Sequence, residues 1–334
     1  MIFVTGGTGL VGSHIPLNLA KSSRNFRALR REKSSLDVCR QIFTNYNAIK
    51  LFNNINWVIG DVNDLISLEE GMSDCTEVIH AAGLVSFHPK DADKLRKINI
   101  EGTENIVNTC LDLGVKKLAY VSSIATLGKE KSHDHIDEEC YFTVKKSESN
   151  YALSKYYAEQ EVWRASQEGL DVVIVNPTII LGPGDWTKGS SQVFQKASTG
   201  LSFYTSGSTG YVDALDVARA TIELLDSKII NERFVVNSEN MYYKLFFEIL
   251  CKEFGKPKPS IKVSPYLIGL IWRFEALRSF FTNSRPLITK ETAISAMTKR
   301  SFSNKKIIKT LKFQFVPVET SIKKYCSWYK KDLS

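Results

Sequence analysis

Cysteine pairs, long apolar runs and internal repeats are absent from this sequence of 334 residues. Its six cysteines stand far apart and form no Cys-x-x-Cys pair, so their spacing supports neither a zinc site nor a disulfide framework. No apolar stretch approaches the ~20 residues of a membrane-spanning helix, so we expect no transmembrane span. Residues 1–4 lead directly into a glycine-rich loop and not into the basic and apolar segments of a signal peptide. These absences favour a cytoplasmic protein in a reducing compartment.

Acidic residues are in the minority, with 36 Asp+Glu against 44 Lys+Arg and a formal net charge of +8. Lysines and arginines gather late in the chain, between residues 299 and 331. A basic surface can attract nucleic acid, anionic lipid or a phosphorylated substrate. No nucleic-acid-binding motif accompanies the charge, so we expect a solvated lysine-rich surface and no nucleic-acid partner. The 43% of hydrophobic residues is typical of a folded protein and excludes a disordered one.

The first half of the sequence alternates short β-branched runs with segments of helical character, as parallel α/β sheets do. The expected strands are residues 2–5, 26–29, 57–59, 77–80, 118–121, 171–175 and 233–236, and the clearest helices are 103–113 and 151–166. The pattern predicts an α/β fold with a doubly wound, Rossmann-like parallel sheet of about seven strands and a smaller, mostly helical substrate cap. We assign residues 1–177 and 211–237 to the dinucleotide-binding domain, and residues 178–210 and 238–334 to the cap.

A glycine-rich loop, residues 5–12 (TGGTGLVG), follows the first expected strand and opens a helix. Read from Gly7, it satisfies the dinucleotide fingerprint G-x-G-x-x-G, whose glycines allow a tight turn, close approach of a pyrophosphate and close helix packing. The N-terminus of the helix offers free N–H groups to the phosphates. The expected cofactor-binding residues of this loop are Gly6, Thr8, Gly9, Leu10, Val11 and Gly12.

The end of the second strand lacks the acidic residue that an NAD site uses to bind the ribose hydroxyls. Arg30 and Arg31 stand there instead. A guanidinium fork matches the oxygens of the 2′-phosphate of NADP, so the sequence favours NADP over NAD, which stays possible. Further cofactor contacts are expected from small or polar residues after the third and fourth strands, namely Asp61, Val62, Ala81, Ala82 and Gly83.

Tyr151 and Lys155 lie one helical turn apart in the helix predicted over residues 151–166, downstream of Ser123. Positions i and i+4 share a helix face, so the lysine can lie beside the phenol. A free phenol has a pKa of about 10, and a neighbouring ammonium would lower that pKa towards the working range of an acid–base catalyst. Ser123 could hold a substrate oxygen by a hydrogen bond.

With these motifs in order, the sequence resembles the extended short-chain dehydrogenases/reductases, also called NAD-dependent epimerases/dehydratases. The matching motifs are residues 5–12, 60–62, 80–83, 99–103, 121–123, Tyr151 with Lys155, 176–177, 182–184, 212–213 and 216–218. The resemblance implies that Ser123, Tyr151 and Lys155 form the family's catalytic triad and that Lys155 also binds the nicotinamide ribose. It further implies cofactor-site positions for Asn99, Ser122, Tyr151, Lys155, Asn176 and Pro177.

Details of the motifs point away from sugar nucleotides within this family. Ile124 and Ala125 follow Ser123, where dehydratase members usually carry an Asp-Glu pair for the elimination of water. Asn176-Pro177-Thr178 looks more like the dihydroflavonol reductase, cinnamoyl-CoA reductase and hydroxysteroid dehydrogenase branches. We therefore expect an NADP(H)-dependent carbonyl reductase or alcohol dehydrogenase acting on a small hydrophobic substrate. A nucleotide-sugar epimerase with tightly bound NAD and a non-catalytic dinucleotide sensor remain the alternatives, and a homodimer stays open.

Several other features are interpreted more plainly. His133, Asp134 and His135 resemble a metal cluster, but they lie in a polar loop with no further ligand partner, so no metal site is expected. His88 follows the cofactor-lining strand and could touch substrate, but an exposed loop histidine is the favoured interpretation. The apolar run of residues 266–272 is too short to span a membrane, and it fits a buried cap helix, a pocket wall or a membrane-surface contact. The apolar cap side chains expected at the substrate are Phe203, Tyr204, Tyr266, Leu270, Trp272 and Phe274.

Arg30 and Arg31 generate the first testable prediction, a preference for NADP(H) over NAD(H). Isothermal calorimetry should show tighter binding of NADPH than of NADH to the wild type, and the Arg30→Ala, Arg31→Ala double variant should lose that preference because the phosphate loses its charged donors. Equal affinities of the wild type for the two cofactors, or an unchanged NADPH affinity in the variant, would sink the assignment.

Overall fold

The central sheet has seven strands, all parallel, in the computed structural model, which describes residues 1–128, 135–145, 148–282 and 289–333. Its spatial order is β10-β6-β5-β4-β1-β2-β3. The strands are β1 (Ile2–Thr5), β2 (Phe26–Arg30), β3 (Asn56–Ile59), β4 (Glu77–His80), β5 (Lys117–Val121), β6 (Asp171–Pro177) and β10 (Glu232–Val236). The predicted doubly wound parallel sheet is confirmed.

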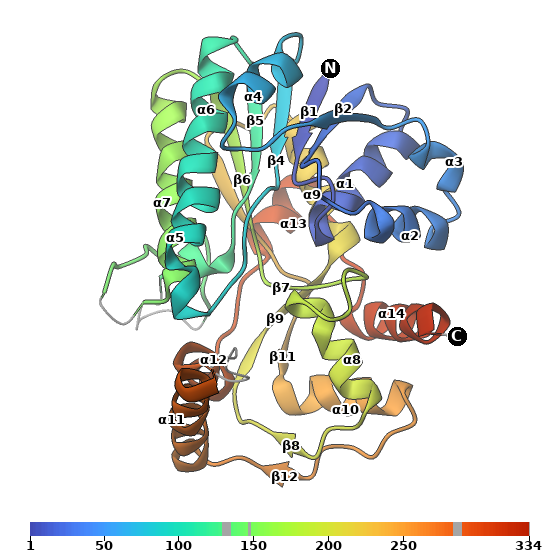
Figure 1. Ribbon diagram of the computed structural model, residues 1–334, viewed down its shortest axis with the longest axis vertical. Helices are drawn as coiled ribbons and strands as arrows, with labels where there is room; N and C mark the ends of the chain where they lie inside the picture. Colours follow the sequence, from blue (N-terminus) through green and yellow to red (C-terminus); the bar gives the residue numbers. More distant parts are fainter. Residues whose placement is uncertain (129–134, 146–147, 283–288, 334) are drawn as a thin grey trace.

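Helices cover both faces of this sheet (Figure 1). Side chains alternate along each strand, so that Ile2 and Val4 pack into one core cluster while Phe3 packs into the other. The first cluster contains side chains of α1 (Leu10–Lys21), α2 (Asp37–Asn45), α3 (Ile49–Phe52) and α9 (Ala214–Asp226). The second contains side chains of α4 (Leu65–Met72), α6 (Gly102–Asp112) and α7 (Asn150–Gln167). Burial on both faces explains why the strands read as continuous apolar runs.

The strand order reverses between β1 and β4, which are neighbours in the sheet although they are far apart in sequence. In open α/β sheets, ligands bind in the crevice at such a switch point, outside the carboxyl ends of the strands. The loop after β1 carries the predicted glycine fingerprint, and the loop after β4 carries Ala81 to Gly83. The fold therefore sets these two loops side by side.

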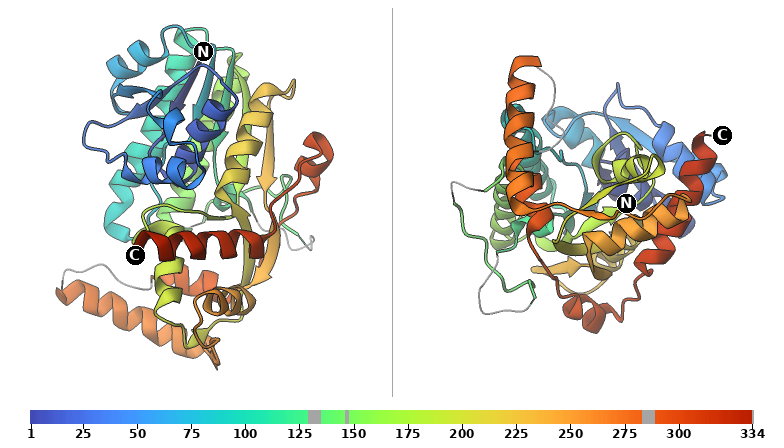
Figure 2. Two further views of the ribbon diagram at one scale, coloured as in Figure 1. Left: turned by 90° about the vertical axis from the view of Figure 1, so that its right-hand side faces the viewer. Right: turned by 90° about the horizontal axis from the view of Figure 1, so that it is seen from below.

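The rest of the chain forms smaller elements at the carboxyl edge of the sheet (Figures 1 and 2). One small sheet has three strands, β7 (Ile179–Leu181), β9 (Ser208–Asp213) and β11 (Glu239–Tyr242). A second small sheet pairs β8 (Phe203–Tyr204) with β12 (Ile261–Lys262). The helices here are α8 (Gln192–Ser198), α10 (Tyr243–Glu253), α11 (Pro265–Thr282), α12 (Lys290–Met297) and α14 (Val318–Leu333), and α13 (Lys305–Leu311) lies between α12 and α14 in the chain. Short elements also lie between β4 and α6: η1 (Pro89–Asp91), α5 (Ala92–Leu95) and the π-helical turn η2 (Arg96–Glu101). Single turns η3 (Ile124–Thr126) and η4 (Gly189–Ser191) complete the chain.

One stretch within the predicted cap packs on the central sheet instead. Ile307 of α13 and Phe313 belong to the same buried cluster as Ile2 and Val4, and Lys306 lies over the Phe234 ring of β10. The residue ranges given for the two domains stay a prediction, and this packing ties α13 to the dinucleotide-binding part. Within the described ranges, none of the helices has the length and apolar character needed to cross a membrane.

Candidate active site

A cleft of about 220 Å³ opens at the switch point between β1 and β4. The structure brings ten predicted cofactor-binding residues together around it: Gly6, Thr8, Gly9, Arg30, Arg31, Asp61, Val62, Ala81, Ala82 and Gly83. Five further lining residues are Leu29, Ser34, Gly60, Leu84 and Ile98. Loops from the ends of β1, β2, β3 and β4 thus share one concave surface, as parallel strands ending at one edge require.

The glycine loop leaves room for an anionic group at the N-terminus of α1. Gly6 has φ +71, and a side chain there would lie 2.6 Å from the backbone nitrogen of Ala82. A Cβ on Gly12 would lie 1.8 Å from the carbonyl oxygen of Gly6, so the helix can pack this closely only without one. At Gly9 a Cβ would meet one neighbour, the Gly6 oxygen at 3.4 Å, so the space before the helix is open. The loop therefore fits a dinucleotide diphosphate.

Arg30 and Arg31 line the same cleft. Arg30 donates one hydrogen bond, from Nη1 to the carbonyl oxygen of Glu32 at 3.3 Å. Its Nε is buried and has no hydrogen-bond partner in the described protein. A buried donor without a partner is costly, so this guanidinium is suited to an acceptor that a ligand supplies.

Ser123 and Tyr151 meet at the carboxyl end of β5. Ser149 caps α7 by accepting a hydrogen bond from the backbone nitrogen of Ala152 at 3.0 Å, which places Tyr151 in the first turn. The Ser123 hydroxyl lies close enough to the Tyr151 phenol to favour its ionised form and so to lower its pKa. Burial raises the pKa of Tyr151, and the nearby Ser123 hydroxyl partly offsets that rise. The two hydroxyl groups of Ser123 and Tyr151 can together bind a carbonyl oxygen and protonate it.

Lys155 lies one turn further along α7, and its ammonium points at β5. It donates to Tyr120 Oη at 2.7 Å and to the carbonyl oxygen of Val121 at 2.9 Å. Burial lowers the pKa of Lys155 to about 7, while the carboxylate of Glu159 opposes that shift. The sequence predicts an ammonium beside Tyr151 that lowers the phenol pKa. In this structure the ammonium is instead bonded to β5, and the phenol pKa is raised.

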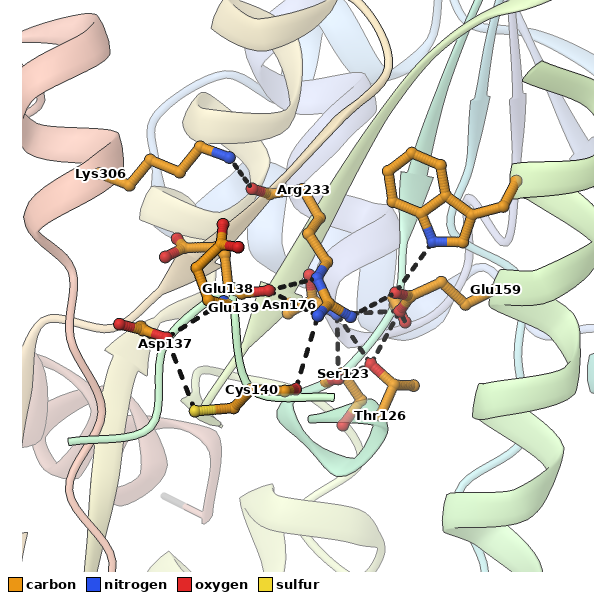
Figure 3. Close-up of polar contacts among 12 residues, drawn as sticks. Ser123, Thr126, Asp137, Glu138, Glu139, Cys140, Glu159, Asn176, Arg233 and Lys306 are labelled. Carbon is orange, nitrogen blue, oxygen red and sulfur yellow. Dashed lines mark hydrogen bonds and ion pairs between the residues drawn. The ribbon is translucent and has the colours of Figure 1, made fainter. Parts of the chain in front are cut away.

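Glu159 is surrounded by polar groups, which include Thr126, Asn176 and Arg233 (Figure 3). One carboxylate oxygen accepts from Ser122 Oγ at 2.5 Å, Thr126 Oγ1 at 2.8 Å and Asn176 Nδ2 at 3.0 Å. The other accepts from Arg233 Nη1 at 3.2 Å. The buried charge is thus both paired and hydrogen-bonded, as burial of a charge requires. Ser122 and Asn176, predicted near the cofactor, both donate to Glu159, and Asn176 Oδ1 is buried without a hydrogen-bond partner in the described protein.

Asn99 joins the cofactor cleft to α7. Its Oδ1 accepts from the backbone nitrogen of Leu84 at 2.7 Å, and its Nδ2 donates to Leu84 O at 3.0 Å and to Ser154 Oγ at 2.9 Å. The side chain is buried in the π-helical turn η2. Asn99 therefore fixes the loop after β4 against the helix that carries Tyr151. Among the other predicted cofactor residues, Leu10, Val11 and Gly12 form the first turn of α1, and Pro177 ends β6.

A family model described as the NAD dependent epimerase/dehydratase family matches residues 2–237, which include the cleft, Ser123, Tyr151 and Lys155. The chain belongs to the NAD dependent epimerase/dehydratase family. It is therefore an NAD(P)-binding enzyme of the extended short-chain dehydrogenase/reductase type, an oxidoreductase class.

Curated relatives and solved structures of this family extend over most of the chain. A Synechocystis sp. protein provisionally named dihydroflavonol 4-reductase is 30% identical over 271 residues, covering 79% of this chain and 76% of the relative. The crystal structure of gox2253 is 26% identical with a TM-score of 0.82, over 99% of this chain and 98% of that chain. UDP-glucose 4-epimerase from Thermus thermophilus, in complex with NAD, is 19% identical with a TM-score of 0.73, over 98% of each chain, a likeness of fold alone.

The sequence interpretation missed two buried groups of this epimerase/dehydratase-family site. Glu159 follows Lys155 by four positions, so helix spacing alone could have placed it on the same face as Tyr151 and Lys155. His80 was noted only as part of a motif. Its Nδ1 is 2.6 Å from Thr5 Oγ1, its Nε2 is 3.0 Å from Thr103 Oγ1, and its ring stacks on Tyr120. Burial, with the charge of Lys155, lowers the pKa of His80 to about 3, so His80 is neutral.

The side chains expected to line a substrate pocket lie on the surface of the cap. Phe203, Tyr266, Leu270 and Phe274 are exposed, and Trp272 packs against the small cluster of Val263, Ile268 and Ala293. Tyr204 lines a separate hollow of about 450 Å³ together with Tyr242, Lys244, Lys262 and Lys299. None of these residues borders the cofactor cleft in the described structure.

The histidines of the polar loops have local roles. His88 caps the turn η1, accepting from the backbone nitrogen of Lys90 at 3.1 Å. His135 Nδ1 lies 2.7 Å from Ser301 Oγ. His133 and Asp134 lie outside the described residues. In the parts of the chain that the structure describes, there is no group of three or more His, Cys, Asp or Glu that could hold a metal ion.

The buried ion pair of Glu159 and Arg233 should stabilise the carboxyl edge of the central sheet. Glu159→Gln is expected to lower the free energy of unfolding by about 3 kcal/mol, because it leaves the Arg233 guanidinium without its counter-charge. Glu161→Gln, two residues along the same helix, is the matched control. Its partner Arg164 is 36% exposed, so a change below about 1 kcal/mol is expected. Urea denaturation followed by circular dichroism measures both, and equal losses would refute the anchoring role.

Proposed function

We propose that this protein is an NADP(H)-dependent oxidoreductase that interconverts a carbonyl and an alcohol on a small hydrophobic substrate. The observation that carries the proposal is the pair of neighbouring hydroxyl groups of Ser123 and Tyr151, close to the loop after β4 that lines the cofactor cleft. The loop after β4 joins the two parts, because Leu84 lines the cleft while Phe87 packs edge-on against the Tyr151 ring at 5.5 Å. A substrate carbonyl placed between Ser123 and Tyr151 would meet the hydroxyl groups of both residues.

The chain's own residues would handle the oxygen and its proton. Ser123 would donate a hydrogen bond to the carbonyl oxygen, and Tyr151 Oη would transfer its proton to that oxygen during reduction. The raised pKa of Tyr151 keeps the phenol protonated at neutral pH, which is the form that reduction needs. Lys155 would bind the nicotinamide ribose and, through its charge, favour the phenolate after proton transfer. The nicotinamide, when bound, supplies or accepts the hydride.

The cofactor preference follows from the charge at the adenosine end of the cleft. Arg30 and Arg31 line that end, and the Nε of Arg30 is a buried donor without a partner. A 2′-phosphate offers several acceptor oxygens to such donors, whereas the ribose hydroxyls of NAD call for a carboxylate. This supports NADP(H) as the cofactor of the proposed reaction.

A hydrophobic substrate is supported by apolar residues in the loop after β4 and directly after Ser123. Val85 and Phe87, in the loop after β4, are partly to largely exposed although they are apolar, and Ile124 and Ala125 follow Ser123. Small-molecule sites are mostly apolar with a few polar anchors, which Ser123 and Tyr151 would provide. The relative named as a dihydroflavonol reductase acts, by its name, on such a compound.

All six cysteines are free thiols, which supports action in the cytoplasm.

Tyr151→Phe tests the proposal directly, because it removes only the phenolic oxygen. In a turnover screen of NADPH and NADH against aldehydes, ketones and steroids, this variant should lose about 10²–10⁴-fold in kcat on the substrate found for the wild type. Tyr157→Phe is the matched control, since Tyr157 is exposed on the same helix, and it should retain the wild-type rate. A rate within a few-fold of wild type for Tyr151→Phe would contradict the proton-transfer role.

A nucleotide-sugar epimerase is the second candidate, since the solved neighbours include UDP-glucose 4-epimerases. The same screen therefore includes UDP-glucose with NAD. No isomerisation is expected, and isomerisation of UDP-glucose without net oxidation of the cofactor would replace the proposed function by this one.

A further inference from the structure

Helix α11 (Pro265–Thr282) is apolar on two opposite faces, but only one face is covered by protein in the described structure. On the covered face, Ile268 and Trp272 pack with Val263, Ala293 and Met297. A helix that is apolar all round is normally enclosed on every side. The second face of α11 therefore needs an explanation.

Five apolar side chains on the second face of α11 form what we call the apolar stripe: Tyr266, Leu267, Leu270, Phe274 and Leu277. They are 78%, 43%, 48%, 68% and 56% exposed, respectively. At 3.6 residues per turn these positions fall within an arc of about 100°, on the side of the helix opposite Ile268. Scattered exposed apolar residues need no explanation, but a continuous row marks an interaction surface.

The segment of the chain that contains the apolar stripe carries charge of mainly one sign. Residues 256–300 contain nine basic residues, Lys256, Lys258, Lys262, Arg273, Arg278, Arg285, Lys290, Lys299 and Arg300, and two acidic ones, Glu275 and Glu291. The difference, 9 − 2 = +7, nearly equals the net charge of +8 of the whole chain. Arg273 and Arg278 fall at the two edges of the stripe's arc. Among the described residues, Lys262, Arg273, Lys290, Lys299 and Arg300 are exposed and form no ion pair with a carboxylate.

We propose that the apolar stripe and its basic surroundings dock the protein on an anionic phospholipid bilayer, with α11 lying in the plane of the interface. Figure 2 shows α11 at the edge of the molecule, at the end away from the central sheet. The stripe would enter the boundary between headgroups and acyl chains, where Tyr266 keeps its hydroxyl near water. The long side chains of Arg273 and the neighbouring lysines would reach anionic headgroups, which attract clustered basic residues.

The charge argues against the other occupants of this face. In a two-fold symmetric dimer, the same patch meets itself, so two segments of charge +7 would be brought together. Like charges at such distances repel, which disfavours a second copy of this chain. A neutral hydrophobic substrate would leave the basic residues without a role. A bilayer with anionic lipid satisfies the apolar and the charged parts together.

Vesicle sedimentation with the full-length protein tests this docking. The wild type should bind phosphatidylcholine vesicles containing roughly a third phosphatidylglycerol about ten-fold more tightly than pure phosphatidylcholine vesicles, and the binding should fall as salt is raised from about 0.1 M to about 0.5 M. The Leu270→Glu, Phe274→Glu double variant should lose the binding by about ten-fold or more, because it places charge in the stripe.

The control is the Leu113→Glu, Ile230→Glu double variant, which adds the same charge at two exposed apolar residues. Leu113 precedes β5 and Ile230 precedes β10, so both residues lie at the edge of the sheet opposite the cap. The control should bind as the wild type does, and both double variants should keep the wild-type melting temperature to within about 2 °C, since the changes are at the surface. No binding of the wild type to anionic vesicles would overturn the proposal. So would equal losses in both variants, or a dimer in sedimentation velocity that only the stripe variant disrupts.

Discussion

A buried carboxylate, that of Glu159, is the interaction on which the carboxyl edge of the sheet depends. It receives hydrogen bonds from the end of β5 through Ser122, from η3 through Thr126 and from β6 through Asn176, and it is ion-paired with Arg233 of β10. A charge in the interior is tolerated only with such partners, so these elements are held in one arrangement. Ser123 lies between two of the bonded residues. The bonds of Ser122 and Thr126 to Glu159 therefore fix the position of Ser123.

Helix α7 presents three functional side chains to this edge because its period places every fourth residue on one face. Tyr151 meets Ser123, Lys155 donates to Tyr120 and Val121, and Glu159 holds the strand ends. The charges are coupled along this row, since Glu159 opposes the fall in the pKa of Lys155 that burial causes. The cofactor cleft is tied to the same helix through Asn99 and Ser154. One helix thus relates the cleft, the hydroxyl pair and the sheet.

Local sequence signals were sufficient for the sheet and the cleft. The strands expected over residues 2–5 and 77–80 have those bounds, and the strand expected over 171–175 continues to Pro177. The glycine loop, Arg30 and Ala82 line one cleft because strand order and parallel direction bring their loops together. These features depend on short-range patterns, such as period, glycine spacing and strand ends.

Long-range packing determined what the sequence could not predict. The spacing of Tyr151 and Lys155 says that they share a face, but the direction of the Lys155 ammonium depends on Tyr120, 35 residues earlier in the chain. The bond from Arg233 to Glu159 spans 74 residues and has no local signature. The apolar cap residues were expected inward, yet Tyr266 and Phe274 are exposed, since an apolar helix does not reveal which of its faces is covered.

The pKa of Tyr151, measured by NMR on protein carrying ring-labelled tyrosine, tests most directly whether this face of α7 is a proton-transfer site. The Tyr151→Phe variant assigns the resonance. Without cofactor, the pKa should lie above the ordinary value of about 10, because burial disfavours the phenolate. With saturating NADP⁺ it should fall below that value, and in Lys155→Met it should not. A Tyr151 pKa that neither NADP⁺ nor Lys155→Met changes would contradict the account.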